Sequence, residues 1–505
     1  MSQISNHSNV ASATGRLRML VPGKNHSVED RQRLRDHHRH YVWMPVAVVM
    51  LGFWLLLAPV SLGYANQDLW VVPSGGRGAW YADSTLDSLR ASLMTWSDVA
   101  SGLLLIVFGA RSLRPNRPVA RWVTCSVGVW LLFAPVFLWA PTAGGFVNAS
   151  LVGIAVVALS VAIGGTPNEP AFAARGPHTP PGWSYNPSSW PQRGILIAFA
   201  LIGLGVSRYM AAYQLGYIDS VWDPLFGSAA GTHAVLDSDV SHAFPVSDAG
   251  LGAGAYTLEL LVAFIGGTAR WRTSPYMVLV FGILVIPLGL THTLLFIAMP
   301  LSVQAWCLFC FVAGIVILPM VVLAVDEVAA MLQHLRQARA RGDRSGSMWK
   351  VFWLGGSADG CTEDQRTPDV VDLPAKPWAV SASSIWGVSL PPGLIIAFGL
   401  GWWLYVTPSV FGVQLGSAEA SMAHVFGTFI IVVSAIAVAE VLRPLRLLVT
   451  LAGLAGAASV WILGAGVGYS ATIFATCAVI AIVSMPRGRI REGYGMWDSL
   501  ARWPR

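Results

Sequence analysis

Long apolar runs recur along the chain, with shorter polar stretches between them. About twelve runs reach the roughly 20 mostly apolar residues that a helix needs to cross a membrane. The runs lack the alternation typical of barrel strands, and lipid cannot satisfy free backbone groups, so each run is predicted to be a helix. The predicted spans cover residues 43–63, 95–110, 122–140, 146–164, 194–214, 250–268, 276–298, 303–325, 392–412, 420–439, 446–466 and 468–485.

The composition agrees with this pattern. Only 11% of the 505 residues are charged and 54% are hydrophobic, a balance that a soluble globular protein of this length does not show. We therefore expect an all-α integral membrane protein with about twelve transmembrane helices, in contact with membrane lipid.

The positive charges gather on one face of the predicted membrane protein. An even number of spans puts both tails on one side, and 29 of the 32 Lys and Arg residues fall on that side. Only Arg77, Arg90 and Arg208 remain for the other side. Because positive loops stay in the cytoplasm, we expect a multi-pass inner (cell) membrane protein with both termini cytoplasmic. These anchoring loops explain the net charge of +6, which indicates no nucleic-acid partner.

The outer thirds of the chain contain an internal repeat. Residues 52–60 (GFWLLLAPV) reappear as residues 128–136 (GVWLLFAPV), with a third copy at residues 401–408 (GWWLYVTP) and an eroded fourth near residues 457–461. Each copy starts a predicted helical hairpin, in which Gly allows close helix contact, Trp lies near the interface and Pro ends or kinks the helix. The pattern resembles the bacterial Ser-Pro-Trp (SPW) membrane repeat.

The repeats and two Pro-, Gly- or charge-rich stretches divide the chain into predicted units. They are a cytoplasmic tail (1–42), an SPW-like repeat pair of four helices (43–165), a linker (166–193), a central four-helix unit (194–330), a cytoplasmic linker (331–391), an SPW-like region of four helices (392–485) and a cytoplasmic tail (486–505).

Cysteine is scarce, with five in the chain, yet Cys307 and Cys310 form a Cys-x-x-Cys motif at the start of the eighth span, where Ser302 is the predicted helix cap. Cysteines three apart on a helix share one face, and a helix amino terminus favours the reactive thiolate. The predicted non-cytoplasmic location is one where disulfides persist. The motif therefore favours redox chemistry, with simple packing of two small residues and a zinc site as alternatives.

Zinc needs two further ligands, and His233, His242 and His292 show no regular spacing relative to the pair, so no metal is predicted. The isolated cysteines are expected to be structural; they are Cys125, Cys361 and Cys477.

Three further residues carry polar groups within apolar spans. An unpaired charge is costly there, so Glu259 and His292 should face the bundle interior, hydrogen-bonding between helices or forming a proton path. Arg208 is expected to snorkel to the membrane surface, or to pair with Asp219 or Asp248.

The central third resembles the vitamin K epoxide reductase family. The matching pieces are residues 235–238 (VLDS), 244–245 (FP), 252–258 (GAGAYTL), 270–272 (RWR) and 306–310 (WCLFC), within a four-helix layout that has a long outer loop after its first helix. In that family the paired cysteines of the fourth helix pass electrons from a protein thiol partner to a bound quinone.

The resemblance implies roles for individual residues. Cys310 would face a quinone (ubiquinone or menaquinone), and Cys307 would exchange with a thioredoxin-like partner on the outer face. Residues Asp248, Trp306 and Tyr256 would contact the quinone.

The chain departs from the family pattern in its outer loop and in the implied quinone pocket. The outer loop contains no cysteine, and Thr232 stands where the second loop cysteine of the family would align. Asp248 replaces the family's quinone-contacting Asn, and Gly314 replaces its Tyr. We expect a membrane thiol/disulfide oxidoreductase that passes electrons between a protein dithiol and a quinone; the alternatives are a non-enzymatic membrane scaffold and a transporter built on the duplicated hairpins.

Overall fold

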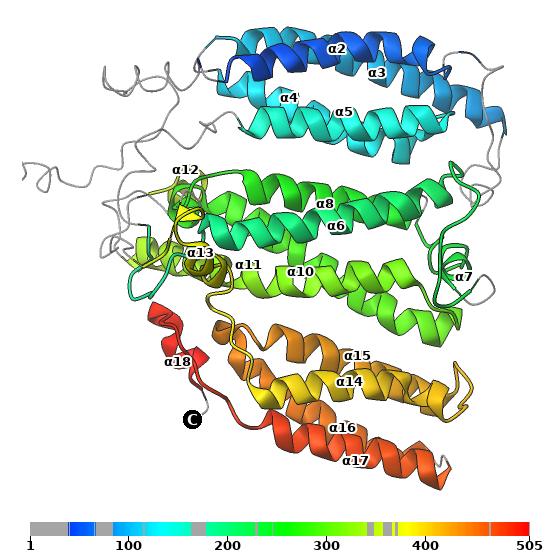
Figure 1. The fold of residues 1–505 in the computed structure, drawn as a ribbon, viewed down its shortest axis with the longest axis vertical. Helices are drawn as coiled ribbons and strands as arrows, with labels where there is room; N and C mark the ends of the chain where they lie inside the picture. Colours follow the sequence, from blue (N-terminus) through cyan, green and yellow to red (C-terminus); the bar gives the residue numbers. More distant parts are fainter. Residues whose placement is uncertain are drawn as a thin grey trace, which may run out of the picture.

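The structure is a computed structural model that describes residues 39, 41–64, 66, 84–114, 117–162, 178–227, 231–244, 246–340, 348–356, 366–368, 372–463 and 466–503. Figure 1 shows three stacked layers of long helices that run along one common direction. The predicted residues Arg77, Pro245 and Cys361 lie outside the described part of the chain.

The layers follow the order of the chain. The first contains α2 (Trp43–Ser61), α3 (Ser84–Ser112), α4 (Pro118–Ala134) with the π-helical turn η3 (Pro135–Trp139), and α5 (Ala143–Ala162). The central layer contains α6 (Trp190–Gln214), α7 (Thr232–Leu236), α8 (Asp248–Phe264), α9 (Arg270–Thr273), α10 (Pro275–Ala298), η4 (Met299–Val303) and α11 (Leu308–Ala340). The last contains α14 (Pro392–Val410), α15 (Ala418–Ile436), η7 (Glu440–Leu445), α16 (Arg446–Leu463) and α17 (Val467–Ser484).

Short helices cover the two ends of the molecule. At one end, α7 lies near the start of α11; we call this the cysteine end. At the opposite end, called the tail end, lie α12 (Met348–Leu354), α13 (Pro377–Ser383), η8 (Gly495–Trp497) and α18 (Asp498–Ala501).

The all-α membrane fold predicted from the apolar runs is confirmed. Eleven helices within the described residues are long and apolar enough to cross a membrane. The 17-residue helix α8 packs along α6 in the central layer and is the twelfth predicted span. Each predicted run overlaps a helix. The run 122–140 covers both α4 and η3, α3 begins well before its predicted start, and α11 continues well beyond its predicted end.

The repeated glycines lie where the two helices of each hairpin cross. A Cβ atom on any of them would come within 3.1 Å of backbone or side-chain atoms of the partner helix, so only glycine allows this approach. The predicted role of this glycine in close helix contact is confirmed. The crossings pair Gly52 with Gly102, Gly128 with Gly153, and Gly401 with Gly427.

Arg208 on α6 connects the central layer to the first layer. Its Nη1 donates to the carbonyl oxygen of Leu132 at 2.8 Å, and Nη2 donates to the hydroxyl of Ser150. The guanidinium carbon also lies 4.3 Å from the ring centroid of Phe146. The expectation that Arg208 snorkels or pairs with Asp219 or Asp248 was wrong, because the two terminal nitrogens of its guanidinium group donate to a carbonyl and a hydroxyl of the neighbouring layer.

A buried ion pair closes the tail end of the central layer. The Nε and Nη2 atoms of Arg270 each donate to a carboxylate oxygen of Glu327 at 2.5 Å, and both side chains are buried. Arg193 donates to the carbonyl oxygens of Ala263, Ile265 and Gly266, which end α8. These contacts satisfy carbonyl groups that a helix end otherwise leaves unpaired.

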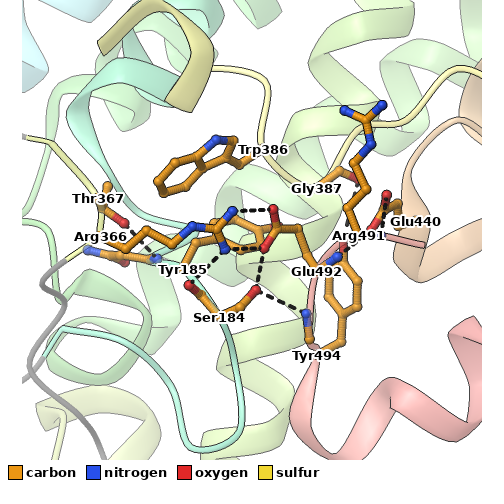
Figure 2. A network of polar contacts seen from close by, with 12 residues as sticks. Ser184, Tyr185, Arg366, Thr367, Trp386, Gly387, Glu440, Arg491, Glu492 and Tyr494 are labelled. Carbon is orange, nitrogen blue, oxygen red and sulfur yellow. Dashed lines mark hydrogen bonds and ion pairs between the residues drawn. The ribbon is translucent and has the colours of Figure 1, made fainter. Parts of the chain in front are cut away.

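Segments predicted as linkers and tail are folded onto this end. Figure 2 shows Glu492, from the carboxyl-terminal segment, accepting hydrogen bonds from Arg366 at 2.6 and 2.8 Å and from the hydroxyl of Ser184. In the same network, both carboxylate oxygens of Glu440 accept from backbone N–H groups of residues 491 and 492 at 3.0 Å. Residues 178–189 and 486–503 are thus packed parts of the fold rather than free connections.

Two tyrosines lie in the interior of this network. The hydroxyl of Tyr185 donates to Asp326 at 2.5 Å, and that of Tyr494 donates to Glu440 at 3.1 Å. Burial, together with the nearby charge of Asp326, raises the pKa of both tyrosines well above the usual range. Both hydroxyls therefore keep their protons and act as hydrogen-bond donors.

Candidate functional site

The Cys307–Cys310 pair lies at the amino terminus of α11. The two sulfurs are 2.16 Å apart, the distance of a disulfide, with the Cα atoms 5.2 Å apart. Cys307 is fully buried and Cys310 is half-buried. The pair therefore presents Cys310 as its more accessible sulfur.

Cys307 itself caps the helix. The N–H of Cys310 lies 3.0 Å from the Cys307 sulfur, and the N–H of Phe311 donates to the Cys307 carbonyl at 3.1 Å. The prediction that Ser302 caps this helix was wrong, because Ser302 belongs to η4 and α11 begins only at Leu308. A sulfur at a helix amino terminus is stabilised as a thiolate when the disulfide is reduced.

The loop between α6 and α8 covers Cys307 through Thr232. The buried hydroxyl of Thr232 accepts from the N–H of Leu308 at 3.1 Å and donates to Asp223 at 2.7 Å. The position predicted to replace a loop cysteine thus lies directly against the start of the cysteine helix.

Asp223 holds this loop with an ionised carboxylate. Partial burial opposes its charge, but hydrogen bonds from Thr232 and from the backbone N–H groups of Leu225 and Phe226 lower its pKa below the usual range. Across the site, the thioether of Met210 on α6 lies 4.0 Å from each cysteine sulfur. The disulfide is therefore enclosed between α6 and the loop.

Trp306, which precedes the pair, packs against the last layer. Its ring centroid lies 5.4 Å from that of Tyr405 on α14 and 5.7 Å from that of His424 on α15. The hydroxyl of Tyr405 donates to the carbonyl oxygen of Phe296 on α10 at 2.8 Å. The carboxyl-terminal helices thus contact the segment that leads into the cysteine pair.

The backbone of that segment is constrained just before Trp306. Gln304 has φ 56°, a left-handed conformation that is uncommon for residues other than glycine. Its amide nitrogen lies 2.5 Å from the position that a Cβ would take on Gly416, in the turn between α14 and α15. Packing against the last layer helps to hold this conformation.

The other two predicted quinone contacts lie in different surroundings. Tyr256 on α8 is fully buried, and its hydroxyl donates to the carbonyl oxygen of Ala313, one turn beyond Cys310. Asp248 accepts from the Gln214 amide at 2.6 Å and from the Ser241 hydroxyl at 2.9 Å. Trp306 is therefore the predicted contact that lies closest to the pair along the chain, while Asp248 and Tyr256 are held by other polar groups.

Glu259 and His292 face the interior, as predicted. His292 is buried, and its Nε2 lies 3.5 Å from the hydroxyl oxygen of Tyr256. Glu259 is fully buried, and neither of its carboxylate oxygens has a hydrogen-bond partner within the described residues. The expectation that Glu259 hydrogen-bonds between helices was wrong.

The site also contains aromatic residues that the sequence did not reveal. The ring of Phe296 on α10 occupies the space beside Gly314, 2.3 Å from the position that a Cβ would take there. Phe296 in turn packs against Phe311, with ring centroids 5.2 Å apart. The neighbouring helix α10 thus places an aromatic ring beside Gly314, which only the fold shows.

Within the described residues, no group of three or more His, Cys, Asp or Glu residues has a metal-binding arrangement. His233 contacts the backbone of Val221, and His242 contacts the carbonyl oxygen of Ser238. Cys125 and Cys477 are free and buried in helical interfaces, in agreement with structural roles.

Comparison with known proteins adds to this geometry. No curated protein and no solved structure matches the chain. Residues 194–325, which hold α6 to the first half of α11, match the Vitamin K epoxide reductase family. The central layer, with its enclosed cysteine pair, is therefore a domain of the vitamin K epoxide reductase family, which points to a membrane oxidoreductase acting through thiols.

Proposed function

We propose that this protein transfers two electrons from a protein dithiol to a membrane quinone through the Cys307–Cys310 disulfide. The observation that carries the proposal is the disulfide at the start of α11, inside the region that matches the family. The flanking layers then serve as scaffolds around this site, which accounts for their contacts with both sides of the central layer.

The reaction is two thiol/disulfide exchanges followed by reoxidation. A partner thiolate attacks Cys307, the bond to Cys310 breaks, and Cys310 leaves as a thiolate that is stabilised at the helix amino terminus. The second partner thiolate then attacks the mixed disulfide, which releases Cys307 as a thiol and leaves the partner oxidised. A quinone supplies the acceptor for two electrons and two protons, and the Cys307–Cys310 bond forms again.

Burial of Cys307 sets a condition on the first exchange. The sulfur is fully covered, and Thr232 joins the covering loop to the backbone of Leu308. A partner reaches Cys307 only after this hydrogen bond opens. The loop carries acidic residues and no Lys or Arg between positions 215 and 250, so it favours a partner with a basic contact surface.

The residues beside the pair suit an aromatic, uncharged acceptor. Trp306, Phe311 and Phe226 bring their rings within 6.4 Å of one another, measured between centroids. Trp306 is half-buried, and we assign its indole N–H as the donor to a quinone carbonyl oxygen. Trp306 and Phe311 are the residues we assign to hold the quinone ring.

The proposed orientation follows from charge. Lys and Arg residues concentrate at the tail end, so that end lies in the cytoplasm and the cysteine end faces the outer side of the inner membrane. A thioredoxin-like thiol partner would then reach the site from that side, where disulfides persist.

Thiol trapping in intact cells tests the proposal. Free thiols are tagged with an alkylating reagent that adds mass, in the wild type, Cys307→Ser and Cys310→Ser, with and without quinone depletion. Cys477→Ser is the matched control, because that cysteine is buried and far from the pair in the sequence. We expect an oxidised pair that becomes reduced on quinone depletion, and a partner trapped on Cys307 in the Cys310→Ser variant. A pair that stays reduced, or is insensitive to quinone, contradicts the proposal.

A further inference from the structure

Four arginines gather at the tail end of the last layer, away from the cysteine site. Arg443 lies in η7, Arg446 begins α16, and Arg487 and Arg502 lie in the segment after α17. The negative charge of Glu440 and the positive charges of Arg446 and Arg487 all act on Arg443. Like charges repel, so this grouping costs free energy unless anions bind to it.

Two arginines of this cluster, Arg443 and Arg487, have buried donors without acceptors within the described residues. Arg443 is fully buried; its Nη2 donates to Ser389 and Val438, but its Nε and Nη1 have no hydrogen-bond partner within the described residues. The Nε of Arg487 is also buried without a partner in the same part of the chain. Buried N–H groups without acceptors are costly, and guanidinium groups match phosphate oxygens best.

Nearby carboxylates neutralise the cluster only in part. The charge of Glu440 acts on Arg443, and both oxygens of Glu440 also accept from the backbone N–H groups of residues 491 and 492. The Oδ1 of Asp498 lies 3.4 Å from the Nη2 of Arg502 and also accepts from the N–H of Tyr494 at 3.2 Å. Two carboxylates beside four guanidinium groups leave a surplus of positive charge.

An open groove lies beside these arginines. It has a volume of about 570 Å³ and is lined by Arg487, Asp498, Ser499, Arg502 and Trp503. Trp503 is 58% exposed, and Met485 and Ile482 at the adjacent end of α17 are 60% and 68% exposed. The groove therefore joins a basic surface to an apolar helix surface at the end of a membrane span, where Trp is typical of the interface.

We propose that this groove binds the phosphate of an anionic phospholipid. The headgroup lies between Arg487 and Arg502, and the acyl chains lie along the exposed apolar side of α17. Free inorganic phosphate carries the same kind of negative charge but has no apolar part that could pack on α17. The apolar surface therefore favours the lipid. The site stands apart from the cysteine pair and does not depend on the proposed redox function.

Lipid binding to the purified full-length protein in detergent tests this assignment. Phosphatidylglycerol, phosphatidylcholine and inorganic phosphate are titrated separately, and binding is followed by native mass spectrometry and by the thermal unfolding midpoint. We expect phosphatidylglycerol alone to bind and to raise the midpoint, and the double variant Arg487→Gln/Arg502→Gln to bind it roughly tenfold more weakly.

Matched variants keep the result interpretable. Arg336→Gln/Arg339→Gln removes the same charge from exposed positions on α11 and is expected to leave binding unchanged. Ser499→Asp adds a negative charge in the groove at an exposed position and should also weaken binding, whereas Ser499→Asn should not. These single changes test the site even if the double variant does not fold. Equal loss in the α11 variant, or equally tight binding of inorganic phosphate, overturns the proposal.

Discussion

The hydroxyl of Thr232 accepts a hydrogen bond from the N–H of Leu308 at 3.1 Å, which joins the outer loop to the residue that follows Cys307. The same hydroxyl donates to Asp223, so the loop, the helix start and the carboxylate form one continuous chain of polar contacts. We expect these contacts to set how often Cys307 becomes accessible.

Replacing Thr232 by Val should expose the disulfide. The change keeps the shape of the side chain but removes two hydrogen bonds, each of which contributes about 1 kcal/mol. We expect the Cys307–Cys310 bond to be reduced by a small thiol roughly tenfold faster. The control is Thr257→Val on α8, where the hydroxyl bonds only to Ala253 of its own helix. Equal acceleration in both variants would falsify the role of the loop.

The loop should protect the disulfide less as the pH falls. The pKa of Asp223 is lower in the folded loop than in the unfolded chain. The ionised carboxylate therefore stabilises the folded loop above the unfolded pKa, and this stabilisation is lost as the pH falls through the folded pKa. We expect a phosphine to reduce the disulfide slowly at neutral pH, where the loop covers Cys307, and faster below about pH 4, where this cover is lost. Asp223→Asn should lack protection at all pH values. An unchanged profile in this variant contradicts the prediction.

Tyr405→Phe should affect the cysteine pair, although Tyr405 belongs to another layer. The variant loses the hydrogen bond to the Phe296 carbonyl, worth about 1 kcal/mol, and loosens the packing around Trp306. Tyr469→Phe is a matched control, because it removes a similar bond, to the carbonyl of Glu419 at 3.0 Å, within the same layer. Both variants should lose similar thermal stability. Only Tyr405→Phe should shift the thiol/disulfide equilibrium measured in glutathione buffers.

The helix crossings predict a clear difference between two glycines. A Cβ on Gly427 would lie 2.9 Å from the carbonyl oxygen of Gly401, whereas a Cβ on Gly399 would meet nothing within 4 Å. Gly427→Ala should therefore lose about 1 to 3 kcal/mol, seen as a lower unfolding midpoint in detergent. Gly399→Ala should be neutral or slightly stabilising, because alanine favours the helix. Similar midpoints for the two variants would show that α14 and α15 can move apart at their crossing without loss of stability.

The helices and the cysteine pair were predictable from the sequence, because both depend on local patterns. Twenty apolar residues have few alternatives to a helix in lipid, and a Cys-x-x-Cys motif places its two sulfurs together by spacing alone. The helix start was harder to place, since the choice between Ser302 and Cys307 as cap depends on η4 and the left-handed Gln304. The SPW resemblance and the domain boundaries stay predictions.

The contacts between layers were not predictable in the same way. Trp306 meets Tyr405 and His424 only because α14 and α15 pack beside α11, and no pattern near Trp306 specifies those partners. Arg208 illustrates the same limit: a lone arginine in an apolar helix suggests snorkelling until a neighbouring layer supplies carbonyl acceptors. One available signal was the density of Trp, Tyr and Phe near the cysteine end of the last layer.

The network at the tail end also limits how early in synthesis the fold can be completed. Ser184 and Glu492 are 308 residues apart in the chain, and translation produces Ser184 long before its partner. Until the segment after α17 is synthesised, Glu440 lacks three of its donors and Tyr494 is missing from the core. Insertion of the last helix into the membrane therefore precedes final assembly, and a chain cut after Ser484 would hold all its spans but leave buried polar groups open to quality-control proteases.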